Sequence, residues 1–246
     1  MTQTTPTRTT RTPPTSSSLE RAIAPTAVDR FLEEHWERRP LVVAREEPGR
    51  FDDLLSTADV ERLVSETALR TPAFRLVKAG ESVSGYTTDL SWRPEPFTGV
   101  ADVRRVLAEF EAGATIVLQG LHHSWLPLAR YCRLLEGFLG HPAQANAYYT
   151  PRGSQGLPVH HDTHEVFTLQ VSGEKRWLVY EPALELPLKD QRYAPELGAP
   201  LSTERRKATS SSSRESVERA SSSHVRTLTP TVMWSESVSE VSAWWS

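Results

Sequence analysis

The spacing of apolar residues changes along this chain, from helical in the first half to strand-like in the second. Apolar positions recur at helical spacing in four stretches, which predicts a helix in each. These stretches are residues 19–36, with a break at Pro25, then 52–67, 100–111 and 125–139. Gly113 and Gly140 follow the last two stretches and predict where those helices end.

Short apolar runs and strict alternation predict strands elsewhere. The runs are L-V-V-A at 41–44, F-R-L-V-K at 74–78 and A-T-I-V-L-Q at 114–119, and the alternating segments are V-F-T-L-Q-V at 166–171 and R-W-L-V-Y at 176–180. Helices come first and antiparallel-type strands follow. We therefore predict an α+β fold, in which a helical section over residues 19–142 leads into a jelly-roll barrel, a double-stranded β-helix, over residues 143–200.

The two ends of the chain differ in composition from the middle. Residues 1–18 are rich in Thr, Ser, Pro and Arg, and we expect a disordered tail there. Residues 201–246 are rich in serine and contain no glycine, which is also typical of a disordered tail. Trp234, Trp244 and Trp245 argue against that interpretation, because solvated tails rarely carry tryptophan.

Composition narrows the class of protein. At 246 residues the chain can hold one large domain or two small ones with a sizeable core. The net charge of −3 gives no excess of basic residues of the kind that binds nucleic acid. The single cysteine, Cys132, excludes an internal disulfide and lies in an apolar helical pattern, which favours packing over nucleophilic chemistry. No apolar run is long enough to span a membrane and no secretory signal is recognisable, so we expect a cytoplasmic protein.

The richest chemistry lies where a Pro- and Gly-rich loop runs into an alternating strand. His160 and Asp162 form a His-x-Asp pair there. Residues two apart on a strand point to the same side, so both can share one metal ion. Two His and one carboxylate with open positions suit non-haem Fe(II). The alternative is a polar loop whose His and Asp meet solvent or cap a turn. His161 points to the opposite side, whereas His164 shares the ligand side.

The sequence around the pair closely resembles the cupin-like JmjC family of the ribosomal oxygenases, which are 2-oxoglutarate-dependent protein hydroxylases. The likeness rests on Y-Y-T-P-R-G-S-Q-G-L-P-V-H-H-D at 148–162, E-V-F-T-L-Q-V-S-G-E-K-R-W at 165–177 and F-L-E-E-H-W-E-R-R-P-L-V-V at 31–43. It covers roughly residues 20 to 200 and implies a cupin/JmjC barrel. The resemblance also implies Fe(II) and 2-oxoglutarate as cofactors, a ribosomal or other protein as substrate, and a homodimer formed through helical segments.

The resemblance assigns roles to particular residues. His160 and Asp162 match two of the family's metal ligands. Lys175 matches the basic residue that pairs with the distal carboxylate of 2-oxoglutarate, and the alternative is an exposed lysine after a Ser-Gly turn. Asn146 and Tyr148 share a strand face and are candidates for hydrogen bonds into the same cavity, although Tyr148 fits core packing equally well. Trp177 and Phe167 are expected to be core aromatics.

The family's third ligand, a distal His, has no clear counterpart. His224 is the only histidine downstream of His164, but S-S-S-H-V-R-T lacks the strand-turn context of a ligand. One hypothesis is a frameshift near residue 200, which would make 201–246 an aberrant segment and leave the barrel incomplete at its C-terminus. His122 and His123 are expected to be capping or surface residues. His35 is expected to be structural.

The sequence therefore supports two hypotheses for the function. The first is a hydroxylase dependent on Fe(II) and 2-oxoglutarate, whose activity would be impaired in this form if the third metal ligand is missing. The second is a non-catalytic cupin-type module that binds a metal or a protein. A cupin sugar isomerase fits less well, because it would usually offer more His and a Glu, and because Lys175 would need another explanation.

Overall fold

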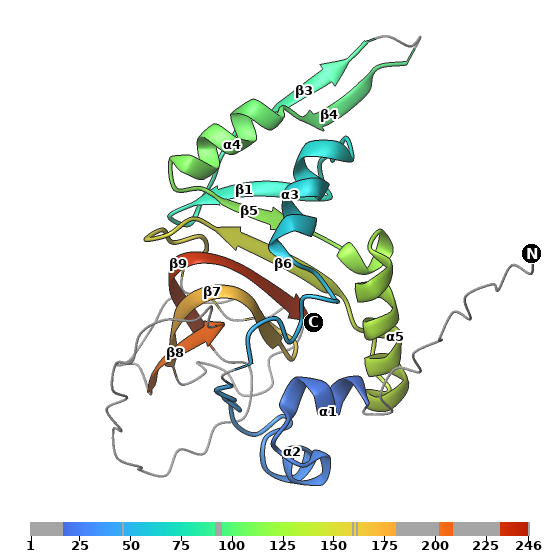
Figure 1. The fold of residues 1–246 in the computed structure, drawn as a ribbon, viewed down its shortest axis with the longest axis vertical. Helices are drawn as coiled ribbons and strands as arrows, with labels where there is room; N and C mark the ends of the chain where they lie inside the picture. The colour runs from blue at the N-terminus through green and yellow to red at the C-terminus, as the bar shows by residue number, and fades with distance from the viewer. Residues whose placement is uncertain are drawn as a thin grey trace, which may run out of the picture.

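A seven-stranded antiparallel sheet forms the centre of the molecule (Figure 1). The computed structural model describes residues 17–45, 47–91, 95–158, 160, 162–180, 202–208 and 232–245. The strands lie in the order β2-β1-β5-β6-β9-β7-β8. Their bounds are β1 Phe74–Lys78, β2 Glu81–Ser82, β5 Thr115–Leu118, β6 Ala145–Thr150, β7 Phe167–Tyr180, β8 Ser202–Ala208 and β9 Val232–Trp245.

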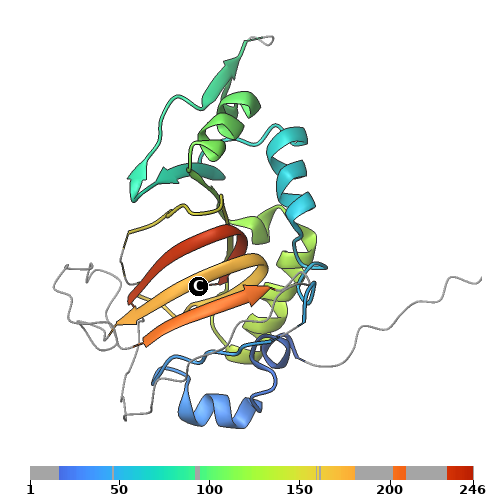
Figure 2. The same cartoon turned by 60° about the vertical axis from the view of Figure 1, so that its left-hand side comes forward.

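Two of these strands come from the serine-rich segment 201–246. β9 pairs with β6 from Ala145↔Trp245 to Thr150↔Glu240, and on its other edge it pairs with β7 along the whole length of that strand. β8 pairs with β7 from Gly173↔Ala208 to Val179↔Ser202. The sheet bends strongly through β9, β7 and β8 (Figure 2). Register shifts on β7 between Gln170 and Glu174 are irregularities of the kind that add bend and twist to a strand. The frameshift hypothesis concerns the gene and stays a prediction.

A second, two-stranded sheet projects from the far end of the molecule (Figure 1). It consists of β3 Thr87–Leu90 and β4 Phe97–Ala101. Arg70 forms an isolated bridge to Val100, and its guanidinium lies 4.0 Å from the centre of the Phe97 ring. These contacts tie the base of the projection to the main body.

Several of the helices begin or end at residues that cap their backbone ends. Their bounds are α1 Ser18–Ile23, α2 Val28–Glu34, α3 Thr57–Glu66, α4 Val103–Glu111, the short 3₁₀ helix η1 Leu121–His123 and α5 Leu126–Leu139. Capping boxes of Ser17 with Glu20 and of Ser56 with Asp59 begin α1 and α3. Gly140 closes α5 in the left-handed conformation, as its position in the sequence predicts.

Three local predictions are wrong. Residues 52–56 are not helical, because Ser56 caps α3 and the helix begins at Thr57. Leu41–Ala44 is not a strand. The Arg45 side chain just after it donates hydrogen bonds to the carbonyls of Ala22 and Ala24, both at 2.6 Å, which ties this segment to the end of α1. Val100 is not helical but lies in β4, because Asp102 caps the helix through the N–H of Arg105 and so α4 begins at Val103.

The core fills the space between the sheet and the helices α1, α3 and α5. Its fully buried side chains include Leu19, Leu55, Val60, Phe74, Leu76, Ile116, Leu118, Leu128 and Leu135. Burial of each large apolar side chain contributes about 1.5–3 kcal/mol. Two hydrogen bonds join distant segments across this core. The Tyr131 hydroxyl donates to the Ser18 carbonyl at 2.7 Å, and the Trp125 Nε1 donates to the Leu54 carbonyl at 2.7 Å.

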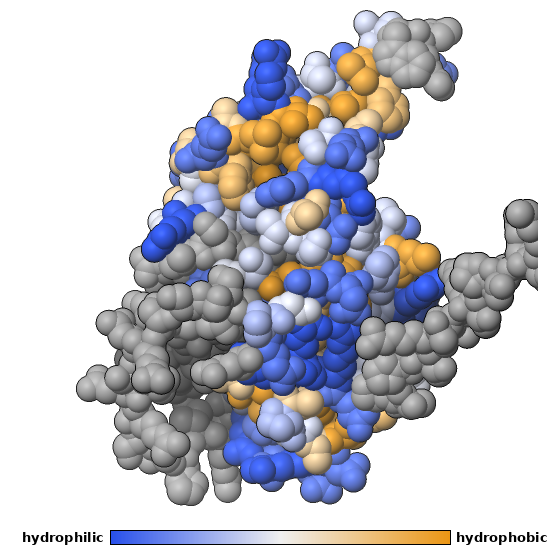
Figure 3. Space-filling model, viewed as in Figure 1, coloured by the Kyte–Doolittle hydropathy of each residue, from blue (hydrophilic) through white to orange (hydrophobic). Residues whose placement is uncertain are grey.

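The surface carries few large apolar side chains in the part of the chain that the structure describes. One face is mostly polar, with apolar side chains gathered over the upper part of the molecule (Figure 3). Leu107 on α4 and Leu126, Leu134 and Phe138 on α5 are among the exposed apolar residues. Among the described residues, the helices are too short or too polar to cross a membrane.

Candidate metal and co-substrate site

His160 is held by the loop that follows β6. Residues 151–158, which we call the ligand loop, connect β6 to this histidine. The His160 Nδ1 lies 2.8 Å from the Pro158 carbonyl oxygen. A carbonyl oxygen can only accept, so Nδ1 carries the proton and the lone pair of the neutral ring lies on Nε2. In metal-binding histidines, the ring nitrogen that does not bind the metal usually donates its N–H to a carbonyl or carboxylate, which fixes the orientation of the ring.

Asp162 follows His160 in irregular backbone before β7 begins at Phe167. The pair therefore lies in a loop rather than on the regular strand from which the sequence predicts a shared side. Asp162 lies near Tyr148 of β6. Burial raises the pKa of the Tyr148 hydroxyl to about 12, and the negative charge of Asp162 adds to that rise. Tyr148 therefore stays protonated at neutral pH and presents an O–H beside the carboxylate.

Asn146 lies two residues before Tyr148 on β6, and both are half-buried. The Asn146 Oδ1 accepts a hydrogen bond from the Gly120 N–H at 2.9 Å. The side-chain oxygen therefore holds the connection between β5 and η1. A contact from Asn146 to a co-substrate stays a prediction.

Lys175 is buried in the middle of β7. Only 4% of its surface is exposed, and its Nζ lies 4.5 Å from the centre of the Trp177 ring, which is equally buried. The alternative of an exposed lysine after a turn is therefore wrong. Burial of an ammonium group costs free energy unless a negative charge or an aromatic ring compensates it. The Trp177 ring supplies part of this compensation. A buried cation on a strand is also what an anionic co-substrate requires.

The other histidines have structural contacts, are exposed, or lie outside the described residues. The His122 Nδ1 accepts the Ala145 N–H at 3.1 Å, and burial lowers the pKa of its ring, as does the neighbouring His123. His35 donates to the Pro40 carbonyl at 3.2 Å and stacks on Phe31, as expected of a structural residue. His164 is exposed. His161 and His224 lie outside the described residues.

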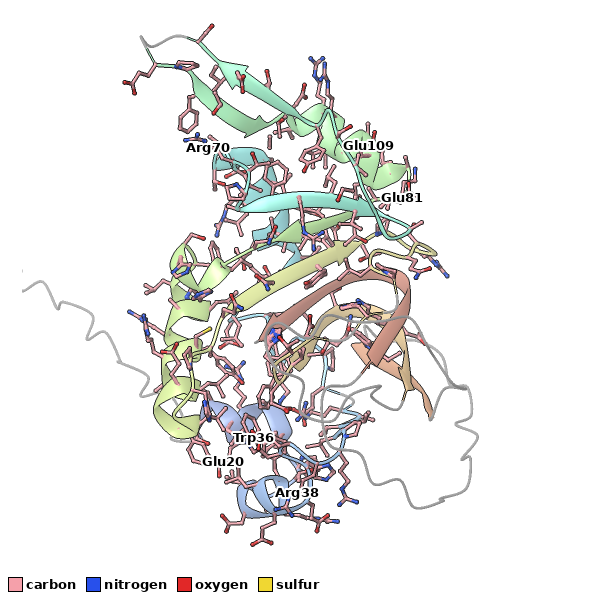
Figure 4. The ribbon with its side chains drawn as sticks, turned by 180° about the vertical axis from the view of Figure 1, so that it is seen from behind. Glu20, Trp36, Arg38, Arg70, Glu81 and Glu109 are labelled. Carbon is pink, nitrogen blue, oxygen red and sulfur yellow. The ribbon has the colours of Figure 1, made fainter. Side chains whose placement is uncertain are left out.

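Cys132 and the two predicted core aromatics agree with the structure. Cys132 is buried, and burial raises the pKa of its thiol to about 12, so it is not a nucleophile. Trp177 is buried, and Phe167 packs against Phe31 and Trp36 with ring centres 6.0 and 6.2 Å apart. Figure 4 shows Trp36 near the lower end of the sheet, beside the N-terminal helices.

Sequence reasoning missed Glu165, the third residue after Asp162. Burial raises the pKa of its carboxyl to about 7, and the nearby negative charge of Glu37 adds to this rise. Nothing in E-V-F-T-L-Q distinguishes this glutamate from an exposed one, because the raised pKa depends first on burial in the folded chain and then on Glu37, far away in the sequence. Glu165 is thus a group near the candidate site that titrates close to neutral pH.

Within the ranges that the structure describes, no group of three or more His, Cys, Asp or Glu side chains is placed to hold a metal ion. His160 and Asp162 supply an imidazole nitrogen and a carboxylate, two of the three ligands of the two-His, one-carboxylate set that suits non-haem Fe(II). The chemistry of this donor set fits the metal that the resemblance implies. Among the described residues, no third ligand for such a metal can be assigned.

Comparison with known proteins points to one family. Residues 121–206 match the family model of the JmjC domain. Mouse ribosomal oxygenase 2 is 34% identical over 175 residues, which are 70% of this chain and 36% of that protein. The bifunctional lysine-specific demethylase and histidyl-hydroxylase NO66 of Drosophila pseudoobscura pseudoobscura is 31% identical over 170 residues, 69% of this chain and 17% of that protein. The chain thus spans well under half the length of these curated relatives.

The fold matches a solved structure over nearly the whole chain. Escherichia coli YcfD, a ribosomal oxygenase solved in complex with cobalt and succinic acid, superposes with a TM-score of 0.51 at 17% identity. The match covers 90% of this chain and 51% of that one. At this identity the likeness concerns the fold alone, a mixed helix-and-strand arrangement of the JmjC and cupin type. The chain is therefore a JmjC-domain protein, related in sequence to the ribosomal oxygenases.

Proposed function

We propose that the chain carries the site of an Fe(II)- and 2-oxoglutarate-dependent oxygenase that hydroxylates a protein side chain. The observation that carries this proposal is the hydrogen bond between the His160 Nδ1 and the Pro158 carbonyl at 2.8 Å, which leaves Nε2 as the nitrogen that can bind a metal, two residues before Asp162 in the chain. The relatives named ribosomal oxygenase support a ribosomal protein as the substrate class. YcfD has also been solved with cobalt and 2-oxoglutarate, which supports a metal ion together with 2-oxoglutarate at such a site.

Each candidate residue then has a defined role. His160, through Nε2, and Asp162, through its carboxylate, would hold the iron together with a third ligand outside the described residues. Lys175 would bind the distal carboxylate of 2-oxoglutarate. Bound iron and 2-oxoglutarate supply the transfer of one oxygen atom of O₂ to a C–H bond, with succinate and carbon dioxide as the other products.

The surroundings of these residues favour binding of an anion. Lys175 is almost completely buried, so its attraction for a carboxylate is screened less than that of a surface lysine. Tyr148 keeps its proton at neutral pH and can donate a hydrogen bond without adding negative charge beside Asp162. Both features lower the cost of placing a dianion in the interior.

The test is formation of succinate from 2-oxoglutarate by the purified chain, with and without Fe(II), alongside thermal unfolding. We expect turnover that needs Fe(II) and that Asp162→Ala abolishes. His164→Ala is the matched control, because His164 is exposed and lies two residues from Asp162, and its turnover should equal that of the wild type. A folded chain that forms no succinate would instead support the non-catalytic cupin-type module.

The substrate is tested separately, because the whole relatives are much longer than this chain. Ribosomal proteins incubated with the active chain should gain the mass of one oxygen on Arg or His residues, detected by peptide mass spectrometry. The cytoplasmic location and the homodimer remain predictions. Cell fractionation and sedimentation of the purified chain would test them.

A further inference from the structure

The turn between β1 and β2 has an unusual backbone. Lys78 pairs with Glu81, so only Ala79 and Gly80 connect the strands. Their φ angles are 50° and 88°, and positive φ at both positions is typical of a type I′ turn. Alanine rarely adopts this conformation, because its Cβ approaches the following carbonyl. A strained alanine persists where surrounding contacts hold it.

Those contacts come from the ligand loop. The Ala79 N–H donates to the Gln155 carbonyl at 3.0 Å, and the Gly80 N–H donates to the Gly156 carbonyl at 2.8 Å. The hydrogen bonds between the two strands of the hairpin do not use these two N–H groups, so they can donate to other acceptors. Figure 4 shows Glu81, the first residue of β2, at the edge where the segment after β6 passes the turn, and Figure 1 shows the same neighbourhood from the other side.

Close packing fixes the same loop at two further points. A Cβ on Gly80 would lie 3.3 Å from the ring of Pro158, and a Cβ on Gly156 would lie 2.6 Å from the Thr115 Oγ1. The Thr115 hydroxyl is itself held by a 3.0 Å hydrogen bond to the Thr150 hydroxyl inside the sheet. The loop therefore lies against both the turn and β5, with no room for a larger residue at Gly156 and a tight contact for one at Gly80.

The contacts continue directly to the candidate ligand. Pro158 packs on Gly80, and the Pro158 carbonyl accepts the hydrogen bond from the His160 Nδ1. That hydrogen bond sets which nitrogen of His160 carries the proton. A displacement of Pro158 would therefore change both the direction of the ring and its protonation pattern.

We propose that the β1–β2 turn is a positioning element for the metal site, and that Gly80 is its key positioning residue. The turn holds the ligand loop through two backbone hydrogen bonds and the Pro158 contact, and the loop in turn orients His160. This inference rests on the proposed function for the role of His160, but the orientation itself can be measured without any metal.

The first experiment compares Gly80→Ala with Gly85→Ala. Gly85 has a φ of 79° in the next turn, and a Cβ there would meet no atom within 4 Å. Gly85→Ala therefore reproduces the backbone strain without the contact to the loop. Nitrogen-15 NMR of the His160 ring in the metal-free protein should show protonated Nδ1 in the wild type and in Gly85→Ala. We expect a mixture of tautomers in Gly80→Ala.

A Co²⁺ titration is the second readout. We expect at least tenfold weaker Co²⁺ binding by Gly80→Ala and unchanged binding by Gly85→Ala, with similar thermal stability in the two variants. Wild-type tautomer and affinity in Gly80→Ala, or equal losses in both variants, would overturn the proposal. If the wild type binds no Co²⁺, the proposed function fails, while the tautomer comparison still decides whether the turn positions His160.

A third measurement uses only the wild type, in case Gly80→Ala does not fold. Because the turn and the metal site are coupled, Co²⁺ should slow hydrogen exchange of the Ala79 and Gly80 amides at least threefold, whereas the Gly85 amide should not change. In a chain that binds Co²⁺, unchanged exchange at Ala79 and Gly80 would contradict the coupling.

Discussion

Glu165 should make the stability of this protein fall as the pH rises toward neutral. Its carboxyl has a pKa of about 7 in the folded protein against an ordinary value of 4.5, because it is buried and lies near Glu37. Between these two values the folded protein holds a proton that the unfolded chain has released. Rising pH therefore favours the unfolded chain, and the loss begins near pH 4.5 and is complete above about pH 7.

The size of this effect follows from the shift. A rise in pKa from 4.5 to about 7 corresponds to about 3 kcal/mol at 1.36 kcal/mol for each pKa unit. The Glu165 side chain is only half-buried, and solvent screens part of the interaction. We therefore expect about 1–2 kcal/mol, which is a large fraction of the stability of a typical domain.

Urea unfolding of the wild type and of Glu165→Gln at pH 5 and pH 8 measures this contribution. The amide cannot ionise, so the variant should be about as stable as the wild type at pH 5 and about 1–2 kcal/mol more stable at pH 8. Glu37→Gln should reduce the pH dependence without abolishing it, since burial is the larger cause. The same stability difference at both pH values would refute the reasoning.

Three further outcomes follow from the core. Tyr131→Phe should lower the free energy of unfolding by about 1 kcal/mol in urea, because the Ser18 carbonyl loses its buried donor; a change below about 0.3 kcal/mol would show that water replaces the hydroxyl. Leu128→Ala should cost about 2–5 kcal/mol, measured in the same way, and a much smaller cost would mean that the site collapses around the cavity. Cys132 should react with iodoacetamide at pH 8 only in urea, and rapid labelling of the folded chain would contradict its burial and raised pKa.

The helices could be predicted from the sequence because their signals are local. α5 has an apolar stripe and a closing Gly140 within a few residues of one another, and the capping box of α3 lies in four consecutive residues. The run Leu41–Ala44 has the same apolar character as a real strand. It is not one, because strand formation depends on a partner, and its neighbour Arg45 is bound to α1 instead.

The candidate site also has one part that the sequence predicts and another that it does not. Motif and resemblance single out His160, Asp162 and Lys175 as candidates, and the burial of Lys175 excludes the alternative of an exposed lysine. The turn at Ala79 and Gly80 could not be linked to His160, because the two segments are separated by many residues and touch mainly through backbone atoms. Backbone contacts of this kind leave no mark in residue type except a glycine where space is short.

The place of β9 in the sheet sets the order in which this protein can assemble during its synthesis. β7 ends at Tyr180 and β9 begins at Val232, yet β9 lies between β6 and β7 and supplies the hydrogen bonds to both. Both partners of the strand that carries Lys175 therefore leave the ribosome after it, and the edge that pairs with β9 stays able to pair with other chains longer than the edge that pairs with β8. A chaperone that covers this edge until residues 232–245 emerge would protect the step at which the nascent chain is most exposed to aggregation.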